Sequence, residues 1–202
     1  MSFASRIVTA LGFCIVIATA PGARAEAPKL DCSTSPGSDK PASLSVDGNL
    51  QPLPVAEFAK QQEMSMNEES FEVFRVNLRD VEGLFSPVEV EASVLVKKGE
   101  MVDGKTFRQL PVADMKQQPS PVKAEGSWLP EVQSIEVRSD PAGFDYQHGI
   151  LASLRLEFGK REGEGLPGRI HLCIAGGQTD DVFQPQPTHT VIVEGTFVAK
   201  LQ

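Results

Sequence analysis

Three histidines are the first residues in this chain whose side chains could bind a metal or move a proton. His148, His171 and His189 lie far apart in the sequence. His171 belongs to an alternating apolar run and His189 precedes another, so pairing of the two strands could bring both imidazoles together. A metal site also needs further ligands and a supporting hydrogen-bond shell. We therefore expect structural or exposed histidines and no bound metal, with His171 on the solvent face of its strand.

Two adjacent aspartates, Asp180 and Asp181, form a second candidate site. They follow Gly176-Gly177 in a polar loop, and carboxylates with flexible backbone oxygens suit a hard cation such as Ca²⁺. The loop lacks the spaced carboxylates and the closing Glu of the EF-hand pattern. We interpret the pair as a solvated turn and predict no cofactor.

The acidic residues could also supply the two carboxylates of a glycosidase. Such a pair must lie about 5–10 Å apart across a cleft, and Glu89 and Glu91 share one face of a predicted strand. A wet sheet face explains them better, because a chain with one Trp and one Tyr offers few rings on which a sugar could stack. The sequence also has no Gly-x-Ser-x-Gly, phosphate-loop, His-Glu-x-x-His or zinc-type Cys/His motif.

Trp128, the only tryptophan, follows a long Pro- and Gln-rich connection over residues 111–126. Connections of this length inside a domain are often functional or mobile, and a lone Trp beside one could form a platform for a ligand. Burial statistics favour the other interpretation, in which the ring fills a core beneath the loop. One helical turn within residues 112–117 is the only regular structure expected in the connection.

The first 25 residues have the layout of a secretory signal peptide. A short segment with one Arg and no acid precedes a fourteen-residue apolar run, and the sequence Ala23-Arg24-Ala25 supplies a cleavage site. A membrane anchor is the rival interpretation, but a span needs about 20 apolar residues. We expect an exported protein, periplasmic or extracellular and of bacterial type, with no membrane association after cleavage.

The cysteines support the same compartment. Cys14 leaves with the signal peptide, so Cys32 and Cys173 are the mature pair. An even number of cysteines in an oxidising compartment favours a disulfide over two redox-active thiols, and no Cys-x-x-Cys is present. The bridge would close a loop of about 140 residues and tie a Pro/Ser-rich N-terminal segment to a late strand.

The charge balance restricts the partners. The chain has 19 basic residues, of which Arg6 and Arg24 leave with the signal peptide, so 17 remain against 27 acidic residues and the mature net charge is −10. An acidic surface disfavours nucleic acid and anionic membranes. The partner is then an unknown protein or a small-molecule ligand.

The mature chain is organised as short strands with one buried face. Apolar and polar residues alternate with period 2, and Asp47-Gly48 and Asp140–Gly143 are turn signals. Roughly eight to ten strands at this spacing predict an all-β fold, an antiparallel β-sandwich of immunoglobulin-like or jelly-roll-like type with at most one or two short helical turns. Residues 42–202 would form this single domain, and residues 26–41 a flexible N-terminal segment. We expect strands at 42–46, 50–55, 70–78, 88–96, 106–110, 131–138, 148–158, 168–174 and 190–201, with a strand and then a loop over 55–66.

These observations favour an exported, non-catalytic β-sandwich protein with a binding or structural accessory role. The alternative is a secreted hydrolase whose carboxylate and histidine residues come together only in three dimensions. A third hypothesis is strand complementation, in which an exposed sheet edge accepts a strand from a partner.

Overall fold

The computed structural model describes residues 32, 38–83, 85–111, 115–147, 152–174 and 189–202. In this part of the chain nearly all regular structure is β, which confirms the predicted all-β class. The two helical elements are single 3-10 turns, η1 and η2, and neither could cross a membrane. The elements are β1 Ser43–Val46, β2 Asn49–Pro52, β3 Val55–Met66, β4 Glu69–Arg79, β5 Val88–Lys97, β6 Thr106–Gln109, η1 Met115–Gln117, β7 Val132–Ser139, η2 Asp140–Ala142, β8 Phe144–Gln147, β9 Ala152–Phe158, β10 Gly165–Ile174 and β11 Val191–Leu201.

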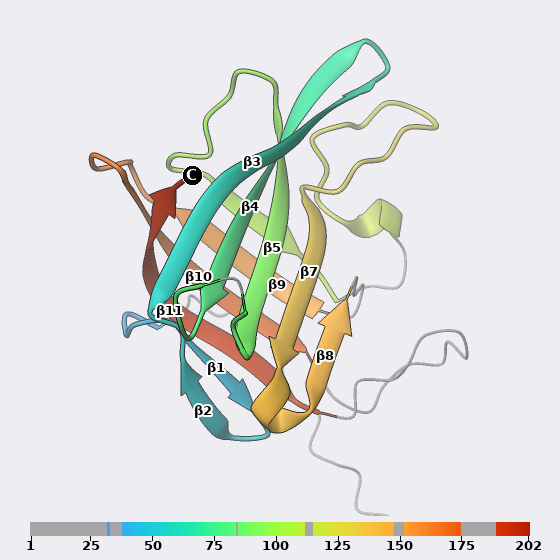
Figure 1. Cartoon of the computed structure of the whole chain (residues 1–202). Helices are drawn as coiled ribbons and strands as arrows, with labels where there is room; N and C mark the ends of the chain where they lie inside the picture. Colours follow the sequence, from blue (N-terminus) through green and yellow to red (C-terminus); the bar gives the residue numbers. More distant parts are fainter. Residues whose placement is uncertain (1–31, 33–37, 84, 112–114, 148–151, 175–188) are drawn as a thin grey trace, which may run out of the picture.

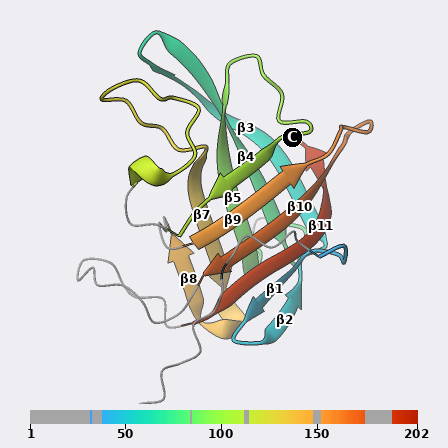
Figure 2. The ribbon, with the colours of Figure 1, turned by 180° about the vertical axis from the view of Figure 1, so that it is seen from behind.

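The strands form two layers that face each other across one main core. Strands β3, β4, β5, β7 and β8 make one layer, and β9, β10 and β11 cross behind them (Figures 1 and 2). The hydrogen-bonded order is β6-β9-β10-β11-β3-β4-β5-β7-β8, and the β1–β2 hairpin pairs with β11. The sheet is open, because β6 and β8 end this order without pairing to each other in the described chain.

The predicted alternation explains the core. On β5 the residues at 88, 90, 92, 94 and 96 are all buried in the main core, and on β9 the same holds for 152, 154, 156 and 158. The aromatic ring of Phe58 stacks on Phe74 of the neighbouring strand β4, and it meets the edge of Phe158 from the other layer. Gly168 on β10 lies opposite Phe197 on β11, whose ring occupies the space that a Cβ at Gly168 would need.

The β3–β4 hairpin is longer than the sequence predicts. The expected loop around Gln61 is wrong: the strand continues to Met66, with a register shift between Lys60 and Gln62 that absorbs one residue as a bulge. The turn is Asn67-Glu68, with φ of 50° and 67°. A two-residue turn with both φ positive matches the twist of a hairpin, but Glu is not a residue that signals it.

Four further details differ from the expected antiparallel sandwich of eight to ten strands. The described chain has eleven strands, and the β11–β3 contact is parallel, Lys200 lying opposite Glu57 and Leu201 opposite Phe58. Strand β8 is not among the expected strands, and β10 begins at Gly165, before the expected start of its strand at residue 168. The predicted strand 148–158 is described only from Ala152 onwards.

The predicted disulfide is present. Cys32 is bonded to Cys173 on the outer side of β10, with 5.5 Å between their Cα atoms. The chain after Cys32 is described again from Ser38, where Asp39 pairs with Arg169 and the Lys40 carbonyl accepts the Thr196 N–H. Gly195, with φ of 134°, leaves room for the backbone of Ala42 to cross β11. The rest of residues 26–37, for which flexibility was expected, lies outside the described chain.

Candidate functional site

The connection between β6 and β7 is fastened to the outer face of β4 and β5. Phe71, Val73 and Leu95 point away from the main core and form a satellite core with Val122 and Leu129 from the connection. Val122 and Leu129 also pair as an antiparallel bridge, and the Ser120 hydroxyl bonds to the backbone of both. The outer face of β4 and β5 is therefore covered by the connection at this point, because Phe71, Val73 and Leu95 make that face apolar.

A second set of bonds fixes the ends of the connection. The Glu131 N–H donates to the Pro119 carbonyl, and the Leu95 N–H donates to the Glu131 carbonyl. At the hairpin tip, the Asn67 amide donates to the Ser127 hydroxyl. The connection is thus held to β5 at its base and to the β3–β4 turn at its far side.

The connection itself lines a hollow of about 900 Å³. Its walls carry two lysines, two glutamines, one glutamate and the sole tryptophan, together with small loop residues. The lining residues are Lys116, Gln117, Gln118, Pro119, Ser120, Val122, Lys123, Ala124, Gly126, Ser127, Trp128 and Glu131.

Trp128 is half-buried in this wall, so it is neither a free surface ring nor a fully buried core residue. Its indole N–H is shielded from solvent and has no acceptor among the described residues. A buried donor without an acceptor is costly, and Trp normally satisfies its N–H. A ligand in the hollow could supply the acceptor, with the ring as an apolar surface beside it.

Gln118 and Glu131 connect the hollow to the free edge of β6. Gln118 is buried, and its carboxamide accepts the Leu110 N–H at 2.8 Å and donates to the Leu110 carbonyl at 2.6 Å. The Glu131 carboxylate accepts the backbone N–H of Arg108. Burial raises the pKa of Glu131, and the Arg108 bond and the positive charges of Lys105 and Lys123 oppose that rise.

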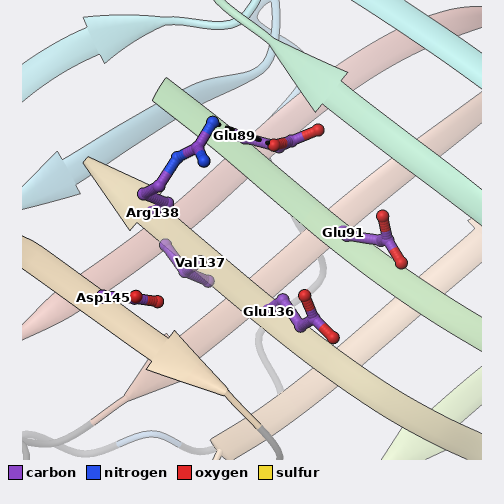
Figure 3. Close-up of a pocket in the computed structure, with 6 residues that line it drawn as sticks. All are labelled: Glu89, Glu91, Glu136, Val137, Arg138 and Asp145. Atoms are coloured by element: carbon purple, nitrogen blue, oxygen red, sulfur yellow. Dashed lines mark hydrogen bonds and ion pairs between the residues drawn. The ribbon is translucent and has the colours of Figure 1, made fainter. Parts of the chain in front are cut away.

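The second hollow is a shallow acidic depression of about 100 Å³ on the outer face of β5, β7 and β8 (Figure 3). Glu89 and Glu91, the pair considered from the sequence, both line it. Glu91 lies opposite Glu136 on β7, and Arg138 and Asp145 complete the row beside them.

The charges of this depression are largely paired within the sheet. Glu89 accepts hydrogen bonds from Asn77 at 2.5 Å and from Arg138 at 3.2 Å, and Glu91 pairs with Arg75 at 3.2 Å. Burial raises the pKa of Glu91; Arg75 opposes this, and Glu136 and Glu89 add to it. A space of this size holds water molecules or one small ion, and is too small for a sugar ring.

The predicted histidines do not come together. Opposite His171 on β11 is Glu194, five residues beyond His189, so the strand rise separates the two imidazoles by roughly 17 Å. His171 lies on the outer face of β10, as the alternation predicts, but it is buried rather than exposed. Its Nδ1 has no partner in the described chain, and burial lowers its pKa.

His189 instead belongs to the turn region of β1. Its Nδ1 lies 2.5 Å from a carboxylate oxygen of Asp47, and its ring meets the edge of Phe144. The His189 bond lowers the pKa of Asp47, with a further contribution from the Thr190 N–H. The residues Asp180, Asp181 and His148 lie outside the described chain. Among the described residues no group of three His, Cys, Asp or Glu side chains could hold a metal ion.

Sequence reasoning identified Trp128 and the length of its connection but missed Gln118 and Glu131. Neither belongs to a motif, and their position becomes evident only when the edge of β6 is seen. Comparison of the chain with protein-family models, curated proteins and solved structures finds no match.

Proposed function

We propose that this chain is an exported, non-catalytic binding protein whose ligand occupies the hollow lined by the connection between β6 and β7. The observation that carries the proposal is the buried indole N–H of Trp128, which lacks an acceptor among the described residues and lines a space of about 900 Å³. Ligand sites are typically concave spaces of about 300–1,000 Å³ with a few convergent polar groups. Export is supported by the signal-type residues 1–25 and by the Cys32–Cys173 bridge.

The wall chemistry favours a ligand that carries hydrogen-bond acceptors. Trp128 offers a donor and a flat apolar face, and the Lys123 side chain adds a positive charge from the same wall. A carbonyl or carboxylate beside the indole would satisfy the buried donor and gain a charge-assisted contact.

The runner-up is a hydrolase that uses the acidic depression. It is favoured by one observation, the raised pKa of Glu91 beside Glu136 and Glu89, since unequal carboxyl pKa values are typical of acid–base pairs. The hollow at Trp128 is the better supported site, because the acidic depression measures only about 100 Å³ and its Glu89 is paired with Arg138.

The test uses the intrinsic fluorescence of Trp128, the only tryptophan in the chain. The mature protein is titrated with amino acids, short peptides, monosaccharides, disaccharides and inorganic phosphate. We expect one class to shift the emission and raise the melting temperature, and Lys123→Gln to weaken that response by about tenfold, as for loss of one charge-assisted bond.

The control is Leu50→Ser, since Leu50 is exposed on β2 and does not line the hollow. This variant should respond like the wild type. A panel that leaves both emission and melting temperature unchanged would contradict the proposal, as would an undiminished response in Lys123→Gln.

A further inference from the structure

The free edge of β6 is occupied by side chains where a neighbouring strand would place its backbone. The Lys105 carbonyl accepts the Phe158 N–H, and Phe107 and Gln109 follow at alternate positions. Backbone groups of an edge strand alternate in direction, so residues 106, 108 and 110 direct theirs away from β9. These outward groups are the ones a further strand would pair with.

Two of these three positions are bonded to side chains that line the hollow. Gln118 bonds to both the N–H and the carbonyl of Leu110, and Glu131 accepts the N–H of Arg108. A carboxamide that donates to and accepts from one residue reproduces the pair of bonds that a strand residue exchanges with its partner. Natural sheets protect open edges in such ways.

We propose that the ligand of the hollow is an extended peptide segment of another protein, which adds a strand to the free edge of β6 and displaces Gln118 from Leu110. This inference rests on the proposed function and names its ligand class. A peptide supplies carbonyl acceptors at regular spacing: one could satisfy the Trp128 indole, and others could replace the side-chain acceptors of the outward N–H groups at Arg108 and Leu110.

The charges of β6 specify one side chain of that peptide. Arg108 is exposed and lies opposite Arg155 on β9, so two like charges face each other across the strand pair. Arg155 is bonded to Glu157 on its own strand. An acidic side chain opposite Arg108 on the incoming strand would form the favourable cross-strand pair that β9 does not provide.

Strand β2, a short edge strand that has no charged residue, is less suitable. Its outward positions are Leu50 and Pro52, because Leu53 donates to Ala42 and the intervening residues pair with β1. Proline has no N–H to donate. The outward backbone groups at the β6 edge are also bonded to Gln118 and Glu131, which line a hollow, whereas β2 lines neither of the two spaces described above.

The experiment selects phage-displayed random octapeptides on the mature protein and measures the affinity of the selected peptides by Trp128 fluorescence. We expect an enriched acidic residue at one fixed position. In synthetic peptides, N-methylation should reduce affinity at least about tenfold at alternate residues only, because every second N–H of an added strand faces the edge.

Variants of Gln118 separate strand addition from simple filling of the hollow. Gln118→Ala removes the competing bonds and should strengthen peptide binding by about three- to tenfold. Gln118→Glu keeps an acceptor for the Leu110 N–H but loses the donor, so its affinity for peptide should lie between those of the wild type and Gln118→Ala. Gln62→Ala is the matched control, since Gln62 is exposed on β3 and does not line the hollow, and the affinity of this variant for peptide should equal that of the wild type.

Three results would overturn the inference: no octapeptide is selected, N-methylation acts without alternation, or both Gln118 variants bind peptide more weakly while retaining the wild-type melting temperature. If Trp128 responds to a sugar or to phosphate and to no peptide, the binding function stands and strand addition falls. If no ligand class produces a response, the proposed function itself fails.

Discussion

His171 is a titratable residue buried on the outer face of the back layer, and it gives stability a pH dependence. It lies between Arg155 on β9 and Glu194 on β11, and Arg169 flanks it on β10. Burial lowers its pKa below the usual 6.5, and the charge of Glu194 only partly opposes this. The neutral imidazole is therefore the form that the folded state favours.

The sign of the effect follows from proton binding. Above pH 6.5 both the folded and the unfolded chain carry neutral His171, so the titration of this residue does not change the free energy of unfolding with pH. As pH falls below 6.5, the unfolded chain binds the proton first, and stability is lost until the folded pKa is passed.

We therefore expect urea unfolding to give a smaller loss of stability between pH 7.5 and pH 5 in His171→Leu than in the wild type. The carboxylates titrate in both proteins, so the difference between the two curves isolates His171. Parallel curves would contradict this role for the imidazole.

At the scale of elements, period-2 alternation predicted most strands because each has one face in the main core. On β5 and β9, the alternate apolar residues that the pattern assigns to one face are the residues buried in the main core. It failed for β3 beyond Lys60, where polar residues continue as a strand because β4 supplies the backbone partners out to Glu69. Tertiary pairing decided the structure there, and no local pattern in Gln61-Gln62-Glu63 reports it.

The candidate site could be predicted only in part for a related reason. A long connection with a lone Trp is visible in the sequence, but its docking depends on Leu95, which alternation assigns to the wet face of β5. Gln118 and Glu131 act on the edge of β6, and the identity of an edge strand is a property of the sheet order, which the sequence does not encode locally.

The satellite core makes a prediction that joins stability to the site. Leu95 is fully buried against Val122 and Leu129, so Leu95→Ala should lower the free energy of unfolding by about 2–5 kcal/mol. The same contact fastens the connection that carries Trp128 and lines the hollow. Loosening it should expose the indole ring, so Trp128 emission should also shift to longer wavelength under conditions where the variant is folded.

Val198→Ala is the control, since Val198 is an exposed residue of β11. It should leave both the urea midpoint and the emission within experimental error of the wild type. A destabilised Leu95→Ala protein with unchanged Trp128 emission would show that the connection is held without the satellite core.

At the scale of the molecule, the disulfide and the hollow lie on outer faces of opposite layers. Cys173 faces outward from β10, and the connection that lines the hollow packs on β4 and β5. The bridge joins positions 141 residues apart, so it restricts the unfolded chain over most of the 202-residue sequence. The open sheet gains from this restriction, because β6 and β8 are not closed by pairing.

The two faces should therefore respond independently to removal of the bridge. In the Cys32→Ser/Cys173→Ser double variant, the free energy of unfolding should fall by about 2–5 kcal/mol, the usual cost of losing a native disulfide. Trp128 emission and the response to bound peptide should stay unchanged below the melting temperature, because neither Cys32 nor Cys173 lines the hollow. Reduction of the disulfide in the wild type should reproduce the stability loss. Loss of peptide binding in a folded double variant would contradict this independence, and would mean that the bridge positions the site as well as restricting the unfolded chain.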